Sequence, residues 1–239
     1  MEIKKKYADQ WNNSSKYFYS KNYYKWMETD IHDFQNILEV GCGCGYSTLS
    51  LVEQGHKVLS LDKNSHCIDM AYDRIQEKGF ENEAAFLEVD ISYPGAVKEL
   101  ADNYQFDIVI CWNMGSYYDF EELRSLYPRM LAYGLKENQI KENVASSYCE
   151  FITWNACMLA AKKGVPFHLV DRAVEEVTEK NDVYYYHLGR EFGYSKITYR
   201  SMMGTSLSAE GVQLKKNGEL QNDPVIPIIL NSILFTEKL

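Results

Sequence analysis

The chain has 239 residues, of which 46% are hydrophobic and 25% charged, a composition typical of a globular protein with a substantial core. Its formal net charge of −9 disfavours a surface built to hold nucleic-acid phosphates. The sequence also contains no apolar run of the roughly 18 residues that a membrane span needs. The six cysteines lie mostly among apolar or small residues, which favours reduced, buried thiols. We therefore expect a cytoplasmic protein that binds neither nucleic acid nor a membrane.

The first half of the chain predicts a helical segment followed by alternating strands and helices. The aromatic-rich stretch Tyr7–Met27 is expected to form one or two helices. Strands and helices that then alternate at short spacing indicate right-handed βαβ units and a parallel sheet. The expected strands are Asn36–Val40, Lys57–Leu61, Ala84–Val89 and Phe106–Trp112, and the expected helices between them are Tyr46–Gln54, Ser65–Lys78 and Pro94–Asn103.

The second half predicts a helical insertion and a return to strands. Glu121–Lys163 is expected to be helical, Val165–Val170 a strand and Arg172–Lys180 a helix. Thr198–Leu207 and Val225–Leu239 read as strands of an antiparallel hairpin at the sheet edge. We expect one α/β domain over residues 1–239, with a Rossmann-like sheet flanked by helices. Its expected parts are a helical cap at 1–35, a cofactor-binding half at 36–120 and an acceptor-side half at 121–239.

A glycine-rich stretch, ILEVGCGCGYSTLSL, joins the first predicted strand to the helix that follows it. Gly41, Gly43 and Gly45 have the spacing G-x-G-x-G, not the G-x-G-x-x-G of dinucleotide-binding loops. Glycines allow a sharp turn and a close approach of a ligand to the backbone. The next helix points its N-terminal amides at the same place. The loop therefore predicts a cofactor site, and a dehydrogenase is the least favoured alternative.

Three carboxylates lie at or near the carboxyl ends of successive predicted strands: Glu39, Asp62 and Asp90. Because the carboxyl ends of parallel strands meet at one edge of a sheet, we expect these side chains to lie beside the glycine loop. An acidic residue at the end of the second strand is placed to accept hydrogen bonds from ribose hydroxyls. No metal is expected, since Cys42 and Cys44 lie inside the loop without a second cysteine–histidine pair at suitable spacing.

These segments together resemble the class I S-adenosylmethionine-dependent methyltransferases. The resemblance rests on ILEVGCGCG, LSLD, FLEVD and FDIVICWN, and it covers Asn36 to Trp112 well and the remainder in outline. It implies a seven-stranded sheet whose last strand is antiparallel. It also implies S-adenosylmethionine as cofactor and S-adenosylhomocysteine as product, with the ribose at Asp62 and the adenine at Asp90 and Ile91. The cofactor-binding residues implied by the resemblance are Glu39, Gly41, Cys42, Gly43, Gly45, Asp62, Lys63, Asp90, Ile91, Cys111, Trp112 and Asn113.

The methyl acceptor is less well defined. After the fourth predicted strand the chain reads CWNMGSYY and lacks the Asn/Asp-Pro-Pro-aromatic sequence of the family branch that methylates DNA bases and glutamine. Aromatic clusters favour a pocket that holds a flat ring or an amine cation. Two are in the cap and one follows this strand: Trp11 with Tyr17, Phe18 and Tyr19; Tyr23, Tyr24 and Trp26; and Tyr117 with Tyr118. Simple packing of the cap aromatics on the sheet is an equal alternative. The residues expected to contact the acceptor are Tyr17, Tyr19, Tyr23 and Tyr118.

A general base is not clearly marked. The catalytic candidates are His187, which lies among tyrosines in VYYYHLGREFGY, and Tyr117. An ordinary surface or core histidine is the alternative for His187. His32 is a further candidate if the cap folds over the site, whereas His168 lies in a predicted buried strand and is expected to be structural.

The favoured function is transfer of a methyl group to an O or N atom of a small molecule by direct displacement. Arg190 and Arg200 are candidates to bind an acceptor carboxylate. Methylation of a protein or RNA is one alternative, although the acidic balance disfavours RNA. A non-catalytic S-adenosylmethionine-binding module is another, with Glu121–Lys163 as a dimerisation element, and a homodimer is left open.

Overall fold

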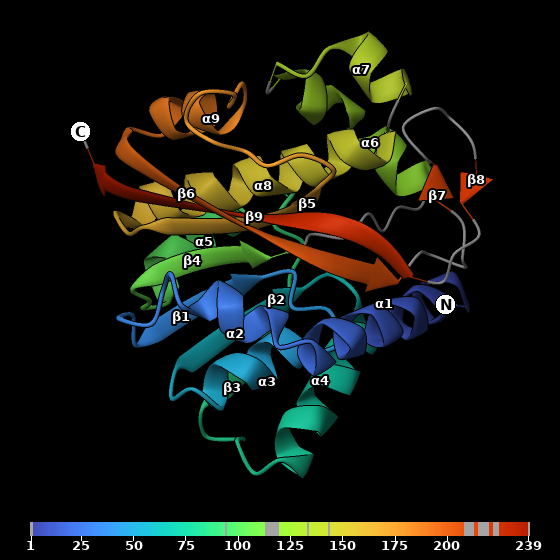
Figure 1. Cartoon of the computed structure of the whole chain (residues 1–239), viewed down its shortest axis with the longest axis vertical. Helices are drawn as coiled ribbons and strands as arrows, with labels where there is room; N and C mark the ends of the chain where they lie inside the picture. Colours follow the sequence, from blue (N-terminus) through green and yellow to red (C-terminus); the bar gives the residue numbers. More distant parts are fainter. Residues whose placement is uncertain are drawn as a thin grey trace.

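A β-sheet lies at the centre of the molecule, with helices on both of its faces (Figure 1). The computed structural model describes residues 2–93, 95–112, 120–132, 134–142, 144–207, 213–214, 220–221 and 225–238. Seven strands pair in the order β3-β2-β1-β4-β5-β9-β6, and β7 and β8 form a separate two-stranded sheet. The strands are β1 Asn36–Val40, β2 Lys57–Asp62, β3 Ala84–Glu88, β4 Ile108–Trp112, β5 Phe167–Ala173, β6 Tyr194–Leu207, β7 Gln213–Leu214, β8 Leu220–Gln221 and β9 Val225–Lys238.

Strands β1 to β5 pair in parallel, whereas β9 runs antiparallel to both β5 and β6. This arrangement confirms the expected mostly parallel, seven-stranded sheet with an antiparallel last strand. The helices are α1 Glu2–Ser20, α2 Tyr23–Glu28, α3 Tyr46–Val52, α4 Ser65–Glu77, α5 Ala96–Asn103, α6 Phe120–Ala132, α7 Glu137–Glu142, α8 Val144–Lys163 and α9 Tyr185–Glu191. Helices α1 and α2 form the cap, and α6 to α8 form the helical insertion. No helix in the described ranges is both long enough and apolar enough to cross a membrane.

The central strand β4 shows how the sheet separates two cores. All five of its residues are buried, as expected for a parallel strand covered on both faces. Because successive side chains point to opposite faces, Cys111 packs into the core under α5 and α8. Trp112 points the other way, into the core under α2 and α3. This alternation decides which residues reach the candidate site.

The cap is tied to the rest of the fold by polar contacts at several points. The hydroxyl of Tyr17 lies 2.6 Å from the hydroxyl of Thr205 in β6, and the Thr205 amide donates to the hydroxyl of Tyr23 at 2.8 Å. At the other end of α1, the Asn64 side chain donates to the carbonyl of Lys4 at 2.9 Å. The helical cap expected for the first 35 residues therefore lies against both α4 and β6.

The helix expected over Arg172–Lys180 is wrong. Strand β5 continues through Arg172 and Ala173, which pair with Leu230 and Ile229 of β9. The helix, α9, begins later, at Tyr185. Pairing with a strand more than fifty residues away in the sequence therefore overrides the local helical preference.

The glycine loop adopts a conformation that depends on its glycines. Gly45 has a φ of +79° and precedes the first turn of α3. A Cβ atom on Gly45 would lie 2.7 Å from the Cβ of Ala71 in α4. The glycine thus lets α3 and α4 approach closely, in addition to allowing the left-handed turn.

Gly45→Ala is expected to destabilise the fold by about 2–4 kcal/mol, the sum of left-handed backbone strain and overpacking. Gly55→Ala is the matched control, since Gly55 has a φ of +94° and a Cβ atom there would meet no atom of the described residues within 4 Å. It should cost only about 1 kcal/mol. Urea unfolding of both variants measures the difference, and equal losses would contradict the close approach of α3 to α4.

Candidate cofactor and acceptor site

The glycine loop is held in place by the end of β2. The amides of Gly41 and Cys42 donate to the carbonyl of Leu61 at 2.8 and 3.0 Å. The amide of Gly43 donates to Asp62 Oδ2 at 2.9 Å, and the amide of Asn64 donates to Asp62 Oδ1, also at 2.9 Å. Asp62 therefore fixes the loop while its carboxylate stays at the carboxyl edge of the sheet.

Glu39 lies beneath this loop and not beside it. Its side chain is 1% exposed and accepts hydrogen bonds from Ser47 and Thr48 of α3 and from Ser60 of β2. Burial raises the pKa of Glu39, and the three hydroxyl donors oppose that rise. The structure therefore gives Glu39 the role of a support that joins β1, β2 and α3.

A cavity, here called the main cavity, opens between the glycine loop, the carboxyl ends of the strands and the cap. The loop, the strand ends and α8 contribute one part of its wall, and the cap contributes an aromatic part. The residues discussed below that line it are Trp11, Phe18, Tyr24, Gly41, Cys42, Gly43, Asp62, Lys63, Asp90, Ile91, Trp112, Tyr148, Ile152 and Arg172.

Two carboxylates at the main cavity suit a ligand that donates hydrogen bonds, as the hydroxyls and amine of a nucleoside do. Asp90 Oδ1 accepts the amide of Ser92 at 2.8 Å, but Asp90 Oδ2 is buried and has no partner within the described residues. Such an orphaned acceptor is costly unless a ligand donates to it. Each oxygen of Asp62 accepts one backbone amide and retains capacity for a ribose hydroxyl. Burial raises the pKa of Asp62, and the amides of Asn64 and Gly43 oppose that rise.

The structure brings most of the expected cofactor residues to the main cavity, but not all. Glu39 supports the loop from below. Gly45 packs against Ala71, and Cys111 faces the core on the opposite side of β4. Asn113, Tyr117 and Tyr118 lie outside the residues that the structure describes. The eight expected residues that line the cavity are Gly41, Cys42, Gly43, Asp62, Lys63, Asp90, Ile91 and Trp112.

Three of the four tyrosines expected to contact the acceptor have other partners, and the fourth, Tyr118, lies outside the described residues. Tyr17 and Tyr23 bond to Thr205, as described above, and the hydroxyl of Tyr19 donates to the carboxylate of Glu53 at 2.8 Å. None of the three lines the main cavity. The helical period explains this result, because neighbouring residues on a helix point in different directions.

Other cap residues take the expected place of these tyrosines. Trp11 and Phe18 are seven residues apart, so they lie on the same face of α1, and both line the main cavity. The ring of Tyr24 lies nearly parallel to that of Trp112, with centroids 6.5 Å apart and an angle of 14°. The i, i+7 spacing of Trp11 and Phe18 was visible in the sequence and could have identified this face.

Two further cavities lie beyond the main one. The first, here called the side cavity, is lined by residues of α8, β5 and α9 and shares Arg172 with the main cavity. The second is lined by His187 and Arg190 among others, and it shares Glu150 and Tyr184 with the side cavity. His187 is exposed there, so the structure does not bring it to the glycine loop.

Arg172 is a site residue that the sequence analysis missed. It lines both the main and the side cavity, and its guanidinium lies 6.0 Å from the centroid of the Phe18 ring. Among the described residues, no carboxylate lies within ion-pair distance of it. Arg200, expected to bind an acceptor carboxylate, is instead paired with Asp30 at 2.7 Å. The only sequence signal for Arg172 was its place after a strand, and the expected helix obscured it.

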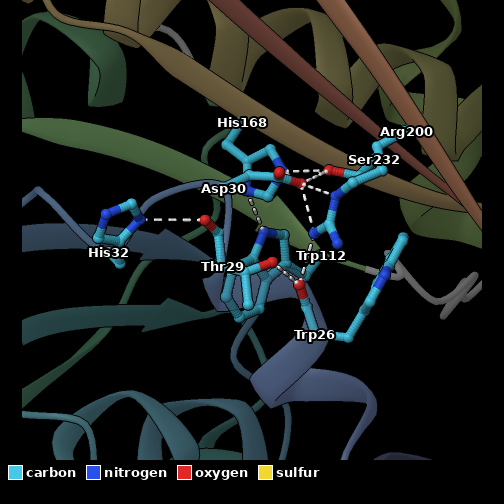
Figure 2. Close-up of polar contacts among 8 residues, drawn as sticks. All are labelled: Trp26, Thr29, Asp30, His32, Trp112, His168, Arg200 and Ser232. Carbon is cyan, nitrogen blue, oxygen red and sulfur yellow. Dashed lines mark hydrogen bonds and ion pairs between the residues drawn. The ribbon is translucent and has the colours of Figure 1, made fainter.

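Behind Trp112 lies a buried polar network (Figure 2). The indole N–H of Trp112 donates to His168 Nδ1 at 3.0 Å, and His168 Nε2 lies 2.7 Å from the hydroxyl of Ser232. His168 is fully buried, as expected for a structural histidine. His32 is exposed and lies 3.1 Å from the carbonyl of Thr29, so it does not reach the main cavity.

Burial lowers the pKa of His168 to about 4, whereas nearby Asp30 acts in the opposite direction and Arg200 adds to the lowering. Above the pKa of an unfolded histidine, near 6.5, the residue is neutral in both states and the fold keeps its full stability. As the pH falls from about 6.5 to about 4, the unfolded chain gains a proton that the folded chain does not. Stability is therefore lost over this window.

The wild type should lose more stability than His168→Asn between pH 6.5 and 4, by up to about 1.4 kcal/mol per pH unit. The variant is less stable at pH 7, because it lacks the bond to Ser232, but the gap should narrow on acidification. Urea unfolding at pH 7, 6 and 5 tests this expectation. If the free energy of unfolding fell equally with pH in the two proteins, His168 would not remain neutral in the folded state.

Comparison with known proteins finds a domain match that includes the glycine loop. Residues 37–134 match a family described as "Methyltransferase domain". Over 88 residues the chain is 32% identical to glycine N-methyltransferase of Mus musculus, a match that covers 34% of this chain but only 28% of the mouse enzyme. The chain thus spans less than a third of that relative.

Two solved structures share the fold at low sequence identity. PH1948 from Pyrococcus horikoshii, a candidate RNA methyltransferase, is 10% identical with a TM-score of 0.53, covering 92% of this chain and 84% of that one. The N-terminal domain of EvdMO1, solved with SAH bound, is 13% identical with a TM-score of 0.51, covering 91% and 80%. The domain match covers residues 37–134, and the two solved structures show that most of the chain shares their fold. S-adenosylmethionine is the cofactor that the matched methyltransferase domain implies.

Asp62→Ala should weaken the binding of S-adenosylhomocysteine at least tenfold, because the ribose loses its acceptors and the Gly43 amide loses its partner. Asp73→Ala is the matched control, since Asp73 is an exposed carboxylate on α4 and should bind like the wild type. Calorimetric titration measures both. Equal affinity of the two variants for S-adenosylhomocysteine would show that the ribose does not bind at Asp62.

Proposed function

We propose that the protein transfers a methyl group from S-adenosylmethionine to an amine or hydroxyl of a small molecule that carries a carboxylate. The observation that carries the proposal is the guanidinium of Arg172, which lies between the main and side cavities with no carboxylate in ion-pair distance among the described residues. A partly buried, unpaired cation favours an anionic ligand. The planar guanidinium also matches a carboxylate in geometry, because it can donate two parallel hydrogen bonds.

The residues that would hold the cofactor are those at the strand ends. Asp62 would accept the ribose hydroxyls, Asp90 Oδ2 would accept from the adenine amine, and Ile91 would pack on the base. The backbone of Gly41 and Gly43 leaves room for the amino-acid tail. When bound, S-adenosylmethionine supplies a methyl group on a sulfonium that leaves as a neutral thioether. These assignments agree with the buried orphan oxygen of Asp90.

The chain's own contribution to catalysis would be alignment and exclusion of water. Trp11, Phe18 and Tyr24 line the main cavity from the cap side, and Trp112 and Tyr148 line it from the sheet and α8. A closed site holds the acceptor in line and keeps solvent from competing. The aromatic rings of Tyr24 and Trp112 can also stabilise positive charge near the transferred group.

The side cavity offers a place for the body of the acceptor. Asp171 accepts the hydroxyl of Tyr185 at 3.0 Å, and Glu150 accepts from Gln139 at 2.9 Å. The hydroxyl of Tyr184 is buried and has no partner among the described residues. A cationic, hydrogen-bond-donating group on the methyl acceptor would pair with these carboxylates and could bond to this hydroxyl, which favours an amino-acid-like molecule.

A general base is not required for an amine acceptor. A neutral amine attacks a sulfonium methyl directly, so the proton can leave to solvent after transfer. The relative with 32% identity over 88 residues is named for N-methylation of glycine, which supports an amine rather than a hydroxyl acceptor. His187 does not line the main cavity, and Tyr117 lies outside the described residues, so both stay predictions.

The test is a set of matched acceptor pairs, each an amine with a carboxylate and the same amine with an amide, such as glycine and glycinamide. Formation of S-adenosylhomocysteine should be faster with the carboxylate of the pair that turns over. Arg172→Gln should lower kcat/KM for that acceptor about tenfold to a hundredfold, the effect of losing a charged hydrogen bond.

Arg190→Gln is the control, because Arg190 lines neither the main cavity nor the side cavity. It should leave turnover unchanged. Preference for the amide, or equal losses in the two arginine variants, would contradict the role of Arg172. Binding of S-adenosylhomocysteine without turnover of any pair would favour the non-catalytic module.

A further inference from the structure

A chain of hydrogen bonds links the wall of the main cavity to the cap. It runs from Trp112 at the end of β4 through His168 in β5 to Ser232 in β9, as described above (Figure 2). The hydroxyl of Ser232 then donates to Asp30 Oδ2 at 2.5 Å. Asp30 lies in the turn that follows α2, 202 residues before Ser232 in the sequence. Four separate elements thus meet in one polar path.

The direction of every proton in this path is determined by chemistry. An indole nitrogen can only donate, so Nδ1 of His168 must accept, and the ring proton lies on Nε2. Nε2 then donates to the Ser232 oxygen, which leaves the Ser232 hydroxyl free to donate to the Asp30 carboxylate. The Asp30 carboxylate therefore acts on Trp112 through Ser232 and His168, without touching the indole itself.

Asp30 is held by a cation from the sheet. Arg200 of β6 donates to Asp30 Oδ2 from Nε at 3.0 Å and from Nη2 at 2.7 Å. Nη2 also donates to the carbonyl of Trp26 at 2.6 Å, and the guanidinium lies 4.2 Å from the centroid of the Trp26 ring. The carboxylate is correctly placed only when the end of α2 is docked on β6.

Filling this space with buried polar groups costs desolvation free energy. His168 is 0% and Ser232 2% exposed, and apolar side chains of similar size would avoid the desolvation cost of two polar groups. What the polar groups add is direction, because a hydrogen bond fixes the plane of the indole and packing alone does not. The orientation of the indole plane matters, since one face of the Trp112 ring packs beside Tyr24 in the wall of the main cavity.

We propose that Asp30 and His168 are positioning residues that fix the ring of Trp112 and make the wall of the main cavity depend on docking of the cap. The consequence for methyl transfer rests on the proposed function, whereas the effect on the Trp112 ring does not. Loss of the network should loosen the ring without unfolding the sheet. With the network intact, the wall is set correctly only when the cap is docked on β6 and β9.

The indole N–H signal of Trp112 in a ¹H–¹⁵N NMR spectrum reports on the ring directly. The chain has four tryptophans, and the signal missing in Trp112→Phe assigns the resonance. Asp30→Asn is expected to shift this signal and to speed its exchange with solvent about tenfold, although Asp30 does not touch Trp112. Asp33→Asn is the matched control, because Asp33 is an exposed carboxylate in the same turn, and it should change nothing.

Two histidine variants separate the ends of the network. The amide oxygen of Asn can take the place of Nδ1, so His168→Asn should retain the bonded Trp112 signal while its coupling to Asp30 is lost. The amide of Gln reaches the position of Nε2, so His168→Gln should leave the indole N–H without its acceptor. A merely structural role of His168 predicts the same signal in both variants, and that result would overturn the proposal.

An unmoved Trp112 signal in folded Asp30→Asn would also overturn it. Ser232→Ala gives an independent test if Asp30→Asn fails to fold, since it removes the central link and should reproduce the shift. Titration with S-adenosylhomocysteine keeps the two proposals apart. The expected NMR changes in a protein that does not bind S-adenosylhomocysteine would leave the positioning role intact and remove its part in methyl transfer.

Discussion

The carboxylate of Glu39 is the interaction on which the cavity depends. It is buried under the glycine loop and accepts hydrogen bonds from the hydroxyls of two successive residues of α3 and of Ser60 in β2. The bonds from Thr48 and Ser60 are 2.6 and 2.8 Å long. Glu39 thereby fixes the start of α3 relative to the ends of β1 and β2. The positions of the loop amides and of the Asp62 carboxylate depend on that arrangement, because the end of β2 holds both.

The cap completes the site from the other side. Its aromatic side chains line the main cavity, and Tyr17, Tyr23 and Asp30 anchor it to β6 and β9. The pairing of β5 with β9 continues to Ala173, so Arg172 is carried to the edge of the main cavity and the hairpin also supports the cap. One long hairpin therefore serves both the acceptor side and the closure of the site.

Local patterns in the sequence predicted the cofactor half well. Short apolar runs separated by helices give the strand ends, and a carboxylate at a strand end lies at the sheet edge whatever the rest of the fold does, so Asp62 and Asp90 could be found. The other half depends on contacts between distant residues. Arg172 was assigned to a helix because its pairing with Leu230 is invisible locally. The tyrosines of α1 were chosen by residue type, whereas the helical phase selects Trp11 and Phe18. No pattern joins Asp30 to Ser232, 202 residues away.

A crystal structure with S-adenosylhomocysteine bound would test the central claim most directly, since it locates every part of the molecule at once. The account predicts the ribose hydroxyls on Asp62, the adenine amine on Asp90 Oδ2, and the sulfur on the side of the main cavity formed by Trp112. S-adenosylhomocysteine bound outside the main cavity, or bound with Asp90 Oδ2 still without a donor, would contradict it.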